Sequence, residues 1–262
     1  MHMSTQTTFL ALSVGNTTAS LANIKESNIS DIETFSSQES SKIIQRTLDR
    51  WKQNQNDEFQ IIIASSNEKV TQQISAALTD QTSNGIWEIG RDLPVAIGQH
   101  LDPETITGTD RLLNAAAAWS LKQQATVIVD AGTCVTVDFV DGQGTFHGGA
   151  IAPGAVMQLQ ALYKNTDSLP DIPLKRPLKE AFGKNTAQAM LQGVFHGIRG
   201  MVRQLTEQYA SRYGAYPSVI ATGGDAPLLF EDDEFIEQII PDLLLQGIVS
   251  SISHALAIEE DE

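Results

Sequence analysis

The sequence has little cysteine and little positive charge. Its 262 residues include one cysteine, Cys134, and 17 basic residues against 32 acidic ones. One cysteine excludes an intramolecular disulfide, which favours a reducing compartment. A net charge of −15 disfavours binding to nucleic acid, because the phosphates of nucleic acid need clustered Lys and Arg. An anionic ligand would therefore have to be bound locally, by backbone N–H groups and cations.

Long apolar runs and low-complexity tracts are also missing. No apolar stretch approaches the roughly 18–20 residues of a membrane helix, and the opening MHMSTQTTF lacks the basic end and apolar run of a signal peptide. Because 41% of the residues are hydrophobic, the chain can bury a core. We expect a cytoplasmic globular protein that binds no membrane and no nucleic acid.

Apolar and helical periodicities predict mixed strands and helices. We predict strands at Phe9–Val14, Thr18–Ile24, Ile61–Ala64, Ala125–Val129, Val135–Val140, Phe146–Ile151 and Ser218–Ala221. We predict helices at Ser41–Trp51, Val70–Leu78, Asp110–Leu121, Ala155–Leu162, Thr186–Tyr213 and Asp242–Glu259. The polar segment Asn28–Glu39 is predicted to be a loop, and Gly85–Ile97 to hold weak strands broken by Pro94.

An internal repeat is the most informative feature of the sequence. LALSVGNTTASLANI aligns without gaps on VIVDAGTCVTVDFV, which places Ser13 over Asp130, Gly15 over Gly132 and Asn16 over Thr133. Each copy is a strand, a glycine turn and a second strand, followed by helices. Hairpins that contain glycine are common, so a chance match is the alternative. We favour a duplicated α/β architecture whose halves are residues 1–118 and 119–262. We expect a cleft between the two halves.

The two glycine turns are candidate phosphate-binding sites. Glycine lacks a Cβ, so backbone N–H groups there can approach a phosphate closely, and Thr17, Thr18 and Thr133 add hydroxyl donors. Asp130, at the end of its predicted strand, is suited to bind a cation, because hard cations prefer oxygen ligands. The alternative for each turn alone is an ordinary hairpin, and two turns in register favour the phosphate-binding interpretation.

Gly108-Thr109-Asp110-Arg111 begins a predicted helix. An Asp at this position is commonly a helix cap. Arg111 is less expected at a helix start, where the helix dipole opposes a cation, and an anion such as a substrate carboxylate would suit its bidentate guanidinium. Two further glycine loops, Gly148–Gly154 and Thr222–Asp225, either line a ligand site or only allow close packing.

In this order, the motifs resemble the type III pantothenate kinase family, which includes proteins named Bvg accessory factors. The resemblance covers roughly Phe9 to Ala257, nearly the whole chain. The motifs that carry it are Ser13-Val14-Gly15-Asn16-Thr17, Gly108-Thr109-Asp110-Arg111, Asp130-Ala131-Gly132-Thr133, Gly148–Gly154, Leu169-Pro170, Gly183–Thr186, Gly193, Gly197, Thr222-Gly223-Gly224-Asp225 and Leu243–Gly247.

The resemblance implies the duplicated, ribonuclease H-like fold of actin and the acetate and sugar kinases, with the active site in the cleft. It also implies ATP-dependent phosphorylation of pantothenate, the first step of coenzyme A biosynthesis, in a homodimer whose neighbouring subunit helps form the pantothenate site. Mg²⁺ and a monovalent cation, K⁺ or NH₄⁺, are the implied metals. These cations suit a chain that is short of positive charge.

The resemblance also implies a role for each candidate residue. Asp110 corresponds to the catalytic base and Asp130 to the monovalent-cation ligand. The ATP contacts correspond to Ser13, Val14, Gly15, Asn16, Thr17, Thr18, Ala19, Ser20 and Thr133. The pantothenate contacts correspond to Gly108, Thr109, Asp110, Arg111, Thr186 and His100, with Arg111 at the carboxylate end of the substrate.

Three departures from the family pattern bear on activity. Ser13 stands where the family has an Asp, and a hydroxyl is a weaker partner for Mg²⁺ than a carboxylate. Ser20 replaces a frequent Lys, and His100 lies near a frequent Tyr. Two alternatives to the pantothenate kinase therefore stay open. One is a catalytically weak or inactive relative that binds ligands or regulates, and the other is a kinase of the same fold with another hydroxy acid as substrate.

Overall fold

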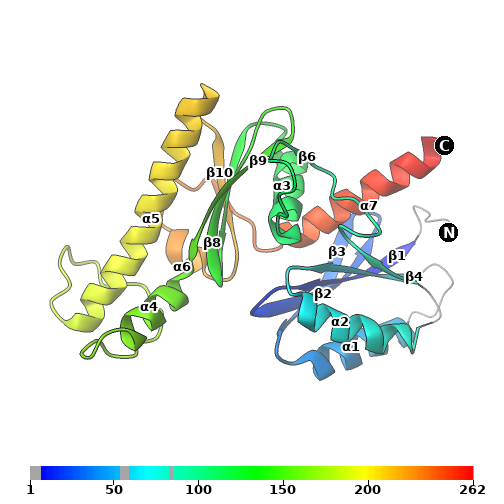
Figure 1. Cartoon of the computed structure of the whole chain (residues 1–262), viewed down its shortest axis with the longest axis horizontal. Coiled ribbons are helices and arrows are strands. Elements are labelled where there is room, and N and C mark those ends of the chain that lie inside the picture. The colour runs from blue at the N-terminus through cyan, green and yellow to red at the C-terminus, as the bar shows by residue number, and fades with distance from the viewer. Residues whose placement is uncertain (1–6, 54–58, 83–84, 262) are drawn as a thin grey trace. The chain divides into compact units, whose positions relative to one another are not determined.

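A computed structural model describes residues 7–53, 59–82 and 85–261 of the chain (Figure 1). The described residues form two compact units. Of the described residues, the first unit takes 7–53, 59–82, 85–97, 104–120 and 243–261, and the second takes 98–103 and 121–242. Among the described residues, no helix is long and apolar enough to cross a membrane.

A five-stranded sheet forms the centre of the first unit. Its strands lie in the order β3-β2-β1-β4-β5. β1 pairs antiparallel with β2 and parallel with β4; β2 pairs antiparallel with β3, and β4 parallel with β5. The bounds are β1 Thr8–Val14, β2 Thr18–Lys25, β3 Asn28–Ser36, β4 Phe59–Ser65 and β5 Ile86–Glu88.

Both faces of β1 and β4, the central strands of this first sheet, are buried under helices. Side chains alternate along β1, so Phe9 and Ala11 pack into one core cluster while Leu10 and Leu12 pack into another. The cluster of Phe9 includes residues of α3 (Thr109–Lys122) and α7 (Leu243–Asp261), and that of Leu10 includes residues of α1 (Ser40–Gln53) and α2 (Glu68–Thr79). Burial on both faces explains why β1 is a continuous apolar run.

A six-stranded sheet forms the centre of the second unit. Its order is β11-β10-β7-β8-β9-β6. β7 pairs antiparallel with β8 and parallel with β10; β8 pairs antiparallel with β9, and β10 parallel with β11. The bounds are β6 Gly98–Gln99, β7 Thr126–Ala131, β8 Cys134–Val140, β9 Thr145–Pro153, β10 Ser218–Thr222 and β11 Gln238–Ile239.

Three helices pack against the second sheet. They are α4 (Ala155–Lys164), α5 (Thr186–Tyr213) and α6 (Ala226–Phe230), and the long α5 runs along the sheet in Figure 1. The Asn185 side chain accepts a hydrogen bond from the N–H of Gln188 at the start of α5. Gly214, at a φ of 87°, ends the helix in the left-handed conformation that glycine adopts without strain.

The topology confirms the duplication inferred from the repeat. The order β3-β2-β1-β4-β5 in the first sheet corresponds strand for strand to β9-β8-β7-β10-β11 in the second, with the same parallel and antiparallel pairings. Ser13 lies opposite Ser20, and the aligned Asp130 lies opposite Thr136. The short β6 extends the second sheet beyond β9 and has no counterpart in the first.

The predicted strands and helices are confirmed within a few residues, with one clear error. The predicted loop at Asn28–Glu39 is wrong, because Asn28–Ser36 forms β3 at the edge of the first sheet. Most of its side chains are exposed, and only Phe35 is buried, so β3 lacks the apolar pattern by which strands are recognised.

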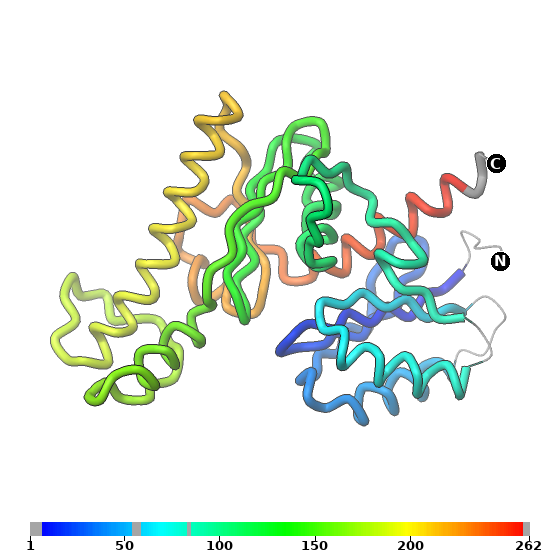
Figure 2. Tube along the Cα trace, viewed as in Figure 1, coloured from blue at the N-terminus to red at the C-terminus, as the bar shows by residue number. Residues whose placement is uncertain are grey.

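The two units also divide the chain differently from the predicted 1–118 and 119–262. The last two residues of α3, 121 and 122, fall in the second unit, and α7 belongs to the first unit rather than to the second. The apolar side chains of Leu245, Ile248 and Ile252 on α7 share a core cluster with Phe9 of β1, which draws the end of the chain back to the first sheet (Figure 2).

Candidate active site

The first glycine turn joins β1 to β2 in the first unit. The Gly15 N–H donates to the Thr18 carbonyl at 2.9 Å and closes the hairpin. Val14 and Ala19 are buried on either side, whereas Asn16, Thr17 and Thr18 are exposed. The tip therefore places the polar side chains of Asn16 and Thr18 at the surface, beside backbone that could approach a phosphate.

Serines of two neighbouring segments hold the carbonyls of this turn. The Ser37 hydroxyl donates to the Gly15 carbonyl at 2.7 Å, and the Ser37 N–H donates to the Thr17 carbonyl at 2.9 Å. On the other side, the N–H of Ser66 donates to the Val14 carbonyl at 3.1 Å. The turn is thus supported from outside the predicted motif. No sequence signal points to Ser37, because it lies in a polar segment without periodicity.

Gly108–Arg111 forms the start of α3, also in the first unit. Asp110 Oδ1 accepts a hydrogen bond of 2.9 Å from the N–H of Arg111, and that N–H also lies 3.1 Å from the Gly108 carbonyl. A Cβ at Gly108 would lie 2.6 Å from Asp110 Oδ1, so glycine leaves room for this carboxylate. Asp110 is half-buried. A helix cap and a proton acceptor both fit this position.

The second glycine turn joins β7 to β8 in the second unit. The Gly132 N–H donates to the Cys134 carbonyl at 2.9 Å. Two distant N–H groups hold the other carbonyls, because Gly154 donates to Thr133 at 3.0 Å and Asp225 donates to Ala131 at 2.9 Å. The structure therefore brings the turn, the end of Gly148–Gly154 and the loop Thr222–Asp225 together.

Two glycines close tightly on this second turn. A Cβ at Gly154 would lie 2.1 Å from the Gly132 carbonyl oxygen, and one at Gly223 would lie 2.3 Å from that of Ala131. The Gly223 position is also 2.5 Å from Asp130 Oδ1, and its φ of +92° disfavours any other residue. Both glycines belong to loops that the sequence left ambiguous, and close packing is part of their role.

Asp225 follows Gly224 in the same loop and is half-buried. Burial raises the pKa of its carboxyl above the ordinary value. It is the N-cap residue of α6, but its side chain accepts no capping hydrogen bond. Sequence reasoning assigned no role to this carboxylate beyond the motif that contains it.

His100 lies in the second unit, immediately after β6. Its N–H donates to the Phe146 carbonyl at 2.9 Å, and its exposed ring meets that of His147 edge-on at 5.3 Å. His147 Nε2 lies 2.7 Å from Asp141 Oδ2. Burial raises the pKa of Asp141, but hydrogen bonds from His147 and from two backbone N–H groups outweigh burial and lower it. Because the His100 side chain is exposed, it is accessible to a ligand.

Thr186 is the first residue of α5, as the motif Gly183–Thr186 predicted, and it is exposed. A Cβ at Gly183 would lie 2.5 Å from the Ala189 N atom, so glycine allows the preceding chain to pack on the first turn of the helix. The hydroxyl of Thr186 is thus presented at a helix N-terminus, where N–H groups favour anionic groups.

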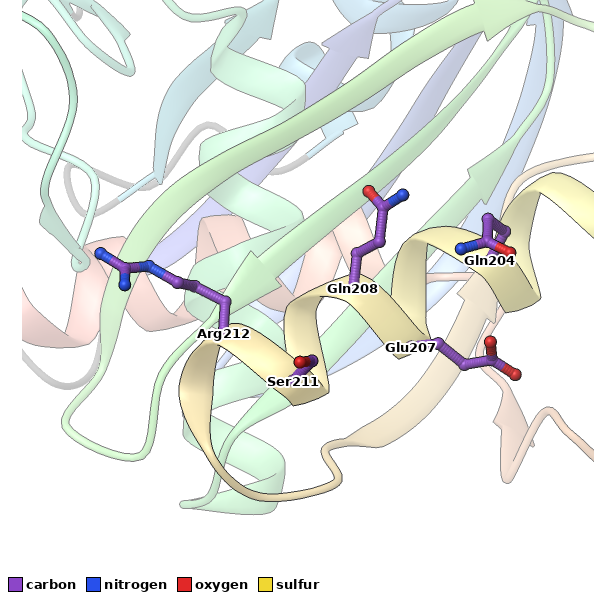
Figure 3. Close-up of a pocket in the computed structure, with 5 residues that line it drawn as sticks. All are labelled: Gln204, Glu207, Gln208, Ser211 and Arg212. Atoms are coloured by element: carbon purple, nitrogen blue, oxygen red, sulfur yellow. The ribbon is translucent and has the colours of Figure 1, made fainter.

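A shallow pocket on α5 contains none of the predicted site residues (Figure 3). Its lining residues all come from this one helix and are Gln204, Glu207, Gln208, Ser211 and Arg212. One acid and one base on a single helix face give no converging set of catalytic groups. We therefore assign no substrate to it.

The described residues contain no group of three or more His, Cys, Asp or Glu that could hold a metal ion. Mg²⁺ does not require such a group, because it is usually bound through one or two carboxylates together with phosphates and water. Asp130, half-buried at the second turn with glycine beside its Oδ1 atom, can supply one such carboxylate.

Comparison with known proteins identifies the family. The sequence model of a family described as type III pantothenate kinase matches residues 9–208. A type III pantothenate kinase of Dehalococcoides mccartyi strain CBDB1 is 39% identical over 160 residues, which are 61% of this chain and 60% of that protein. One from Rhodospirillum rubrum is 39% identical over 158 residues, 60% of this chain and 61% of that protein. The chain spans about 60% of the length of these curated relatives.

Solved structures agree on the fold. A conserved putative Baf family transcriptional activator from Campylobacter jejuni matches with a TM-score of 0.62 and 20% identity, over 94% of this chain and 98% of that one. MreB5 of Spiroplasma citri, solved with ADP, matches with a TM-score of 0.56 and 11% identity, over 98% and 99%. The predicted actin-like, duplicated α/β fold is therefore confirmed. With the family match over residues 9–208, this chain belongs to the type III pantothenate kinase family.

Proposed function

We propose that this protein is a pantothenate kinase, a transferase that uses ATP to convert pantothenate to 4′-phosphopantothenate, the first step of coenzyme A biosynthesis. The observation that carries the proposal is the family match over residues 9–208, which contains both glycine turns and Gly108–Arg111. Curated relatives with the same description support it. Neither the comparisons nor the described residues favour the inactive alternative or another hydroxy acid.

Asp110 is the proposed catalytic base. The hydroxyl oxygen of pantothenate forms a bond to the γ-phosphorus of ATP, the bond from that phosphorus to the leaving oxygen of ADP breaks, and the hydroxyl proton passes to the Asp110 carboxylate. The single hydrogen bond from the Arg111 N–H to Oδ1 supports this role, because it fixes the carboxylate while leaving it lone pairs to accept a proton.

The pantothenate contacts are proposed at Gly108, Thr109, Asp110, Arg111, Thr186 and His100. Arg111 would bind the carboxylate of pantothenate through its planar guanidinium. The exposed positions of Thr186 and His100 support contacts with a ligand.

The ATP contacts are proposed at both glycine turns, from Ser13 to Ser20 and at Thr133. The exposed tip at Asn16–Thr18 supports this assignment, because an acidic chain must bind phosphate with neutral donors and bound cations. The cations are Mg²⁺ and a monovalent ion such as K⁺ or NH₄⁺, and we assign Asp130 to the monovalent ion. When bound, they neutralise phosphate charge.

A cytoplasmic homodimer completes the proposal. Apolar side chains are exposed on β9, on α4 and in the segment before α5. Ile151 of β9 is 62% exposed, and Leu178 and Phe182 before α5 are 60% and 79% exposed. Exposed apolar surface of this kind supports a subunit interface, and the neighbouring subunit would help form the pantothenate site. Light scattering on the purified protein should give twice the 28.4 kDa of the chain, and a monomer at all concentrations would contradict the dimer.

The release of ADP tests the proposed function. We expect ADP to form from ATP in the presence of pantothenate, Mg²⁺ and K⁺, and the rate to fall to background when pantothenate is omitted. Loss of activity without K⁺, and its recovery with NH₄⁺, would support the monovalent cation. Hydrolysis of ATP that does not depend on pantothenate would contradict the proposal. A higher kcat/KM for a different hydroxy acid would point instead to a kinase of the same fold with that hydroxy acid as substrate.

A further inference from the structure

Ser37 is a buried polar residue that no motif includes. It follows the last residue of β3 and is 2% exposed, although its neighbours Ser36 and Gln38 are both exposed. Buried hydroxyls in proteins are generally hydrogen-bonded. The partners of Ser37 therefore indicate what this position does.

Both hydrogen bonds of Ser37 go to the first glycine turn. Its hydroxyl donates to the Gly15 carbonyl at 2.7 Å and its backbone N–H to the Thr17 carbonyl at 2.9 Å. Twenty-two positions separate Ser37 from Gly15, so this contact ties the end of β3 to the turn between β1 and β2. One residue thus holds the carbonyls of two peptide groups within the turn.

Holding a carbonyl also fixes the N–H of the same peptide group. No cis peptide bond occurs among the described residues, and in a trans peptide the carbonyl and the following N–H point in opposite directions. The bond from Ser37 to the Gly15 carbonyl therefore turns the Asn16 N–H away from Ser37. Asn16 is exposed, and its N–H has no acceptor among the described residues.

We propose that the Ser37 hydroxyl is a positioning group for nucleotide phosphate, acting by orienting the Gly15–Asn16 peptide so that the Asn16 N–H faces the ligand. This inference rests on the proposed function only in taking the first turn as an ATP contact. Ser37 itself does not touch the nucleotide. The alternative is that Ser37 only stabilises the hairpin.

Ser37→Ala separates these two roles, because it removes the hydroxyl bond to Gly15 and keeps the backbone bond to Thr17. Ser36→Ala is the matched control, since it makes the same chemical change at the adjacent, exposed position. We expect the dissociation constant of MgADP, measured by calorimetry well below the unfolding midpoints, to rise about 3- to 10-fold for Ser37→Ala, as the loss of one hydrogen bond implies. For Ser36→Ala it should stay within about twofold of the parent.

In the kinase assay, Ser37→Ala should raise the KM for ATP by a similar factor and leave the KM for pantothenate unchanged. A lower unfolding midpoint with an unchanged MgADP dissociation constant would overturn the proposal in favour of a structural role. A parent protein that binds no MgADP would also overturn it. A parent that binds MgADP but does not phosphorylate pantothenate would overturn only the proposed function, and the ratio of dissociation constants would still decide the role of Ser37.

Discussion

The two glycine turns occupy equivalent places in the two halves of the fold, yet they are supported differently. The first is held by serines, through the hydroxyl and N–H of Ser37 and the N–H of Ser66. The second is held by the N–H groups of Gly154 and Asp225, with Gly154 and Gly223 so close that neither has room for a Cβ.

The first turn thus depends on hydrogen bonds from serines, whereas the second also depends on the absence of a Cβ at two glycines. Removing one hydrogen bond typically costs about 0.5–1.5 kcal/mol. A methyl group forced against backbone oxygens costs about 1–3 kcal/mol, and a strained positive φ adds about 1–3 kcal/mol more. The first turn should therefore tolerate single substitutions in its support better than the second. The two halves share the order and pairing of their strands but differ in how the turn is fixed.

Gly223→Ala should have the largest effect on this comparison. The new Cβ would meet the Ala131 carbonyl oxygen and Asp130 Oδ1 at a φ of +92°, so we expect a loss of about 2–5 kcal/mol in the free energy of unfolding and a large fall in kcat/KM. Chemical denaturation and the ADP-release assay measure both.

The matched control is Gly224→Ala, because its Cβ would meet nothing within 4 Å and its φ is not positive. It should differ from the parent by less than about 1 kcal/mol. Equal losses in the two variants would mean that the close approach of Gly223 to the second turn is unimportant.

Ser13→Asp makes the first turn resemble the second at the one position where their charges differ. Asp130 occupies the equivalent strand position, so the hairpin frame accommodates a carboxylate there. We expect the Mg²⁺ concentration for half-maximal activity to fall severalfold, because a carboxylate binds Mg²⁺ better than a hydroxyl. Without Mg²⁺ the variant should be slightly less stable, because the chain is already acidic.

The control for that change is Ser13→Asn, which has similar size and no charge. Its Mg²⁺ dependence should match the parent's. If Ser13→Asp needs as much Mg²⁺ as the parent and turns over no faster, then Ser13 is not near the metal, and its difference from the family pattern has no bearing on activity.

Glu33→Gln tests β3, the strand that ends immediately before Ser37, and should have a smaller effect. Hydrogen bonds from Arg46 and Arg50 lower the pKa of Glu33 from 4.5 to about 2. The stability that Glu33 contributes is therefore fully present above pH 4.5 and is lost as the pH falls toward 2. Because the Glu33 side chain is 34% exposed, we expect the variant to lose only about 1–2 kcal/mol at pH 7.

Unfolding midpoints of parent and variant, compared from pH 7 to pH 2, give the measurement. The difference should shrink as the pH falls, because protonation removes the same interaction in the parent. Glu68→Gln, at an exposed position on α2, should show no such convergence. A difference that stays constant with pH would show that the charge of Glu33 is not what holds β3 to α1.

Much of the fold could be predicted from the sequence, because its signals are local. Neighbouring residues are enough to recognise the apolar runs of β1 and β4, the Ala- and Leu-rich helix α3 and the capping residues of α5. The internal repeat, which aligns Ser13 with Asp130, predicted the topology that the two sheets share. β3 was missed because an edge strand with exposed side chains has no apolar alternation.

The supports of the two turns could not be predicted, because they depend on contacts between distant segments. Ser37 has no distinguishing feature in the sequence, and only the folded structure shows that it contacts Gly15. Gly154 and Gly223 stood out as glycines, but only the fold shows which carbonyl oxygens they approach. Asp225 likewise acquires its raised pKa from burial, which the sequence does not encode locally.

Phosphate transfer by the Asp110→Asn variant tests the central claim most directly. Asn keeps an oxygen that can accept the Arg111 N–H and so preserves the helix start, but it cannot take up a proton as a base does. Mass spectrometry of the product should show 4′-phosphopantothenate formed by the parent and by Asp80→Asn, a control at an exposed position. The Asp110→Asn rate should be lower by about 10²–10⁴-fold with an unchanged unfolding midpoint. An Asp110→Asn rate above about half that of the parent would show that Asp110 is only a helix cap, and a parent that forms no phosphopantothenate would contradict the proposed function itself.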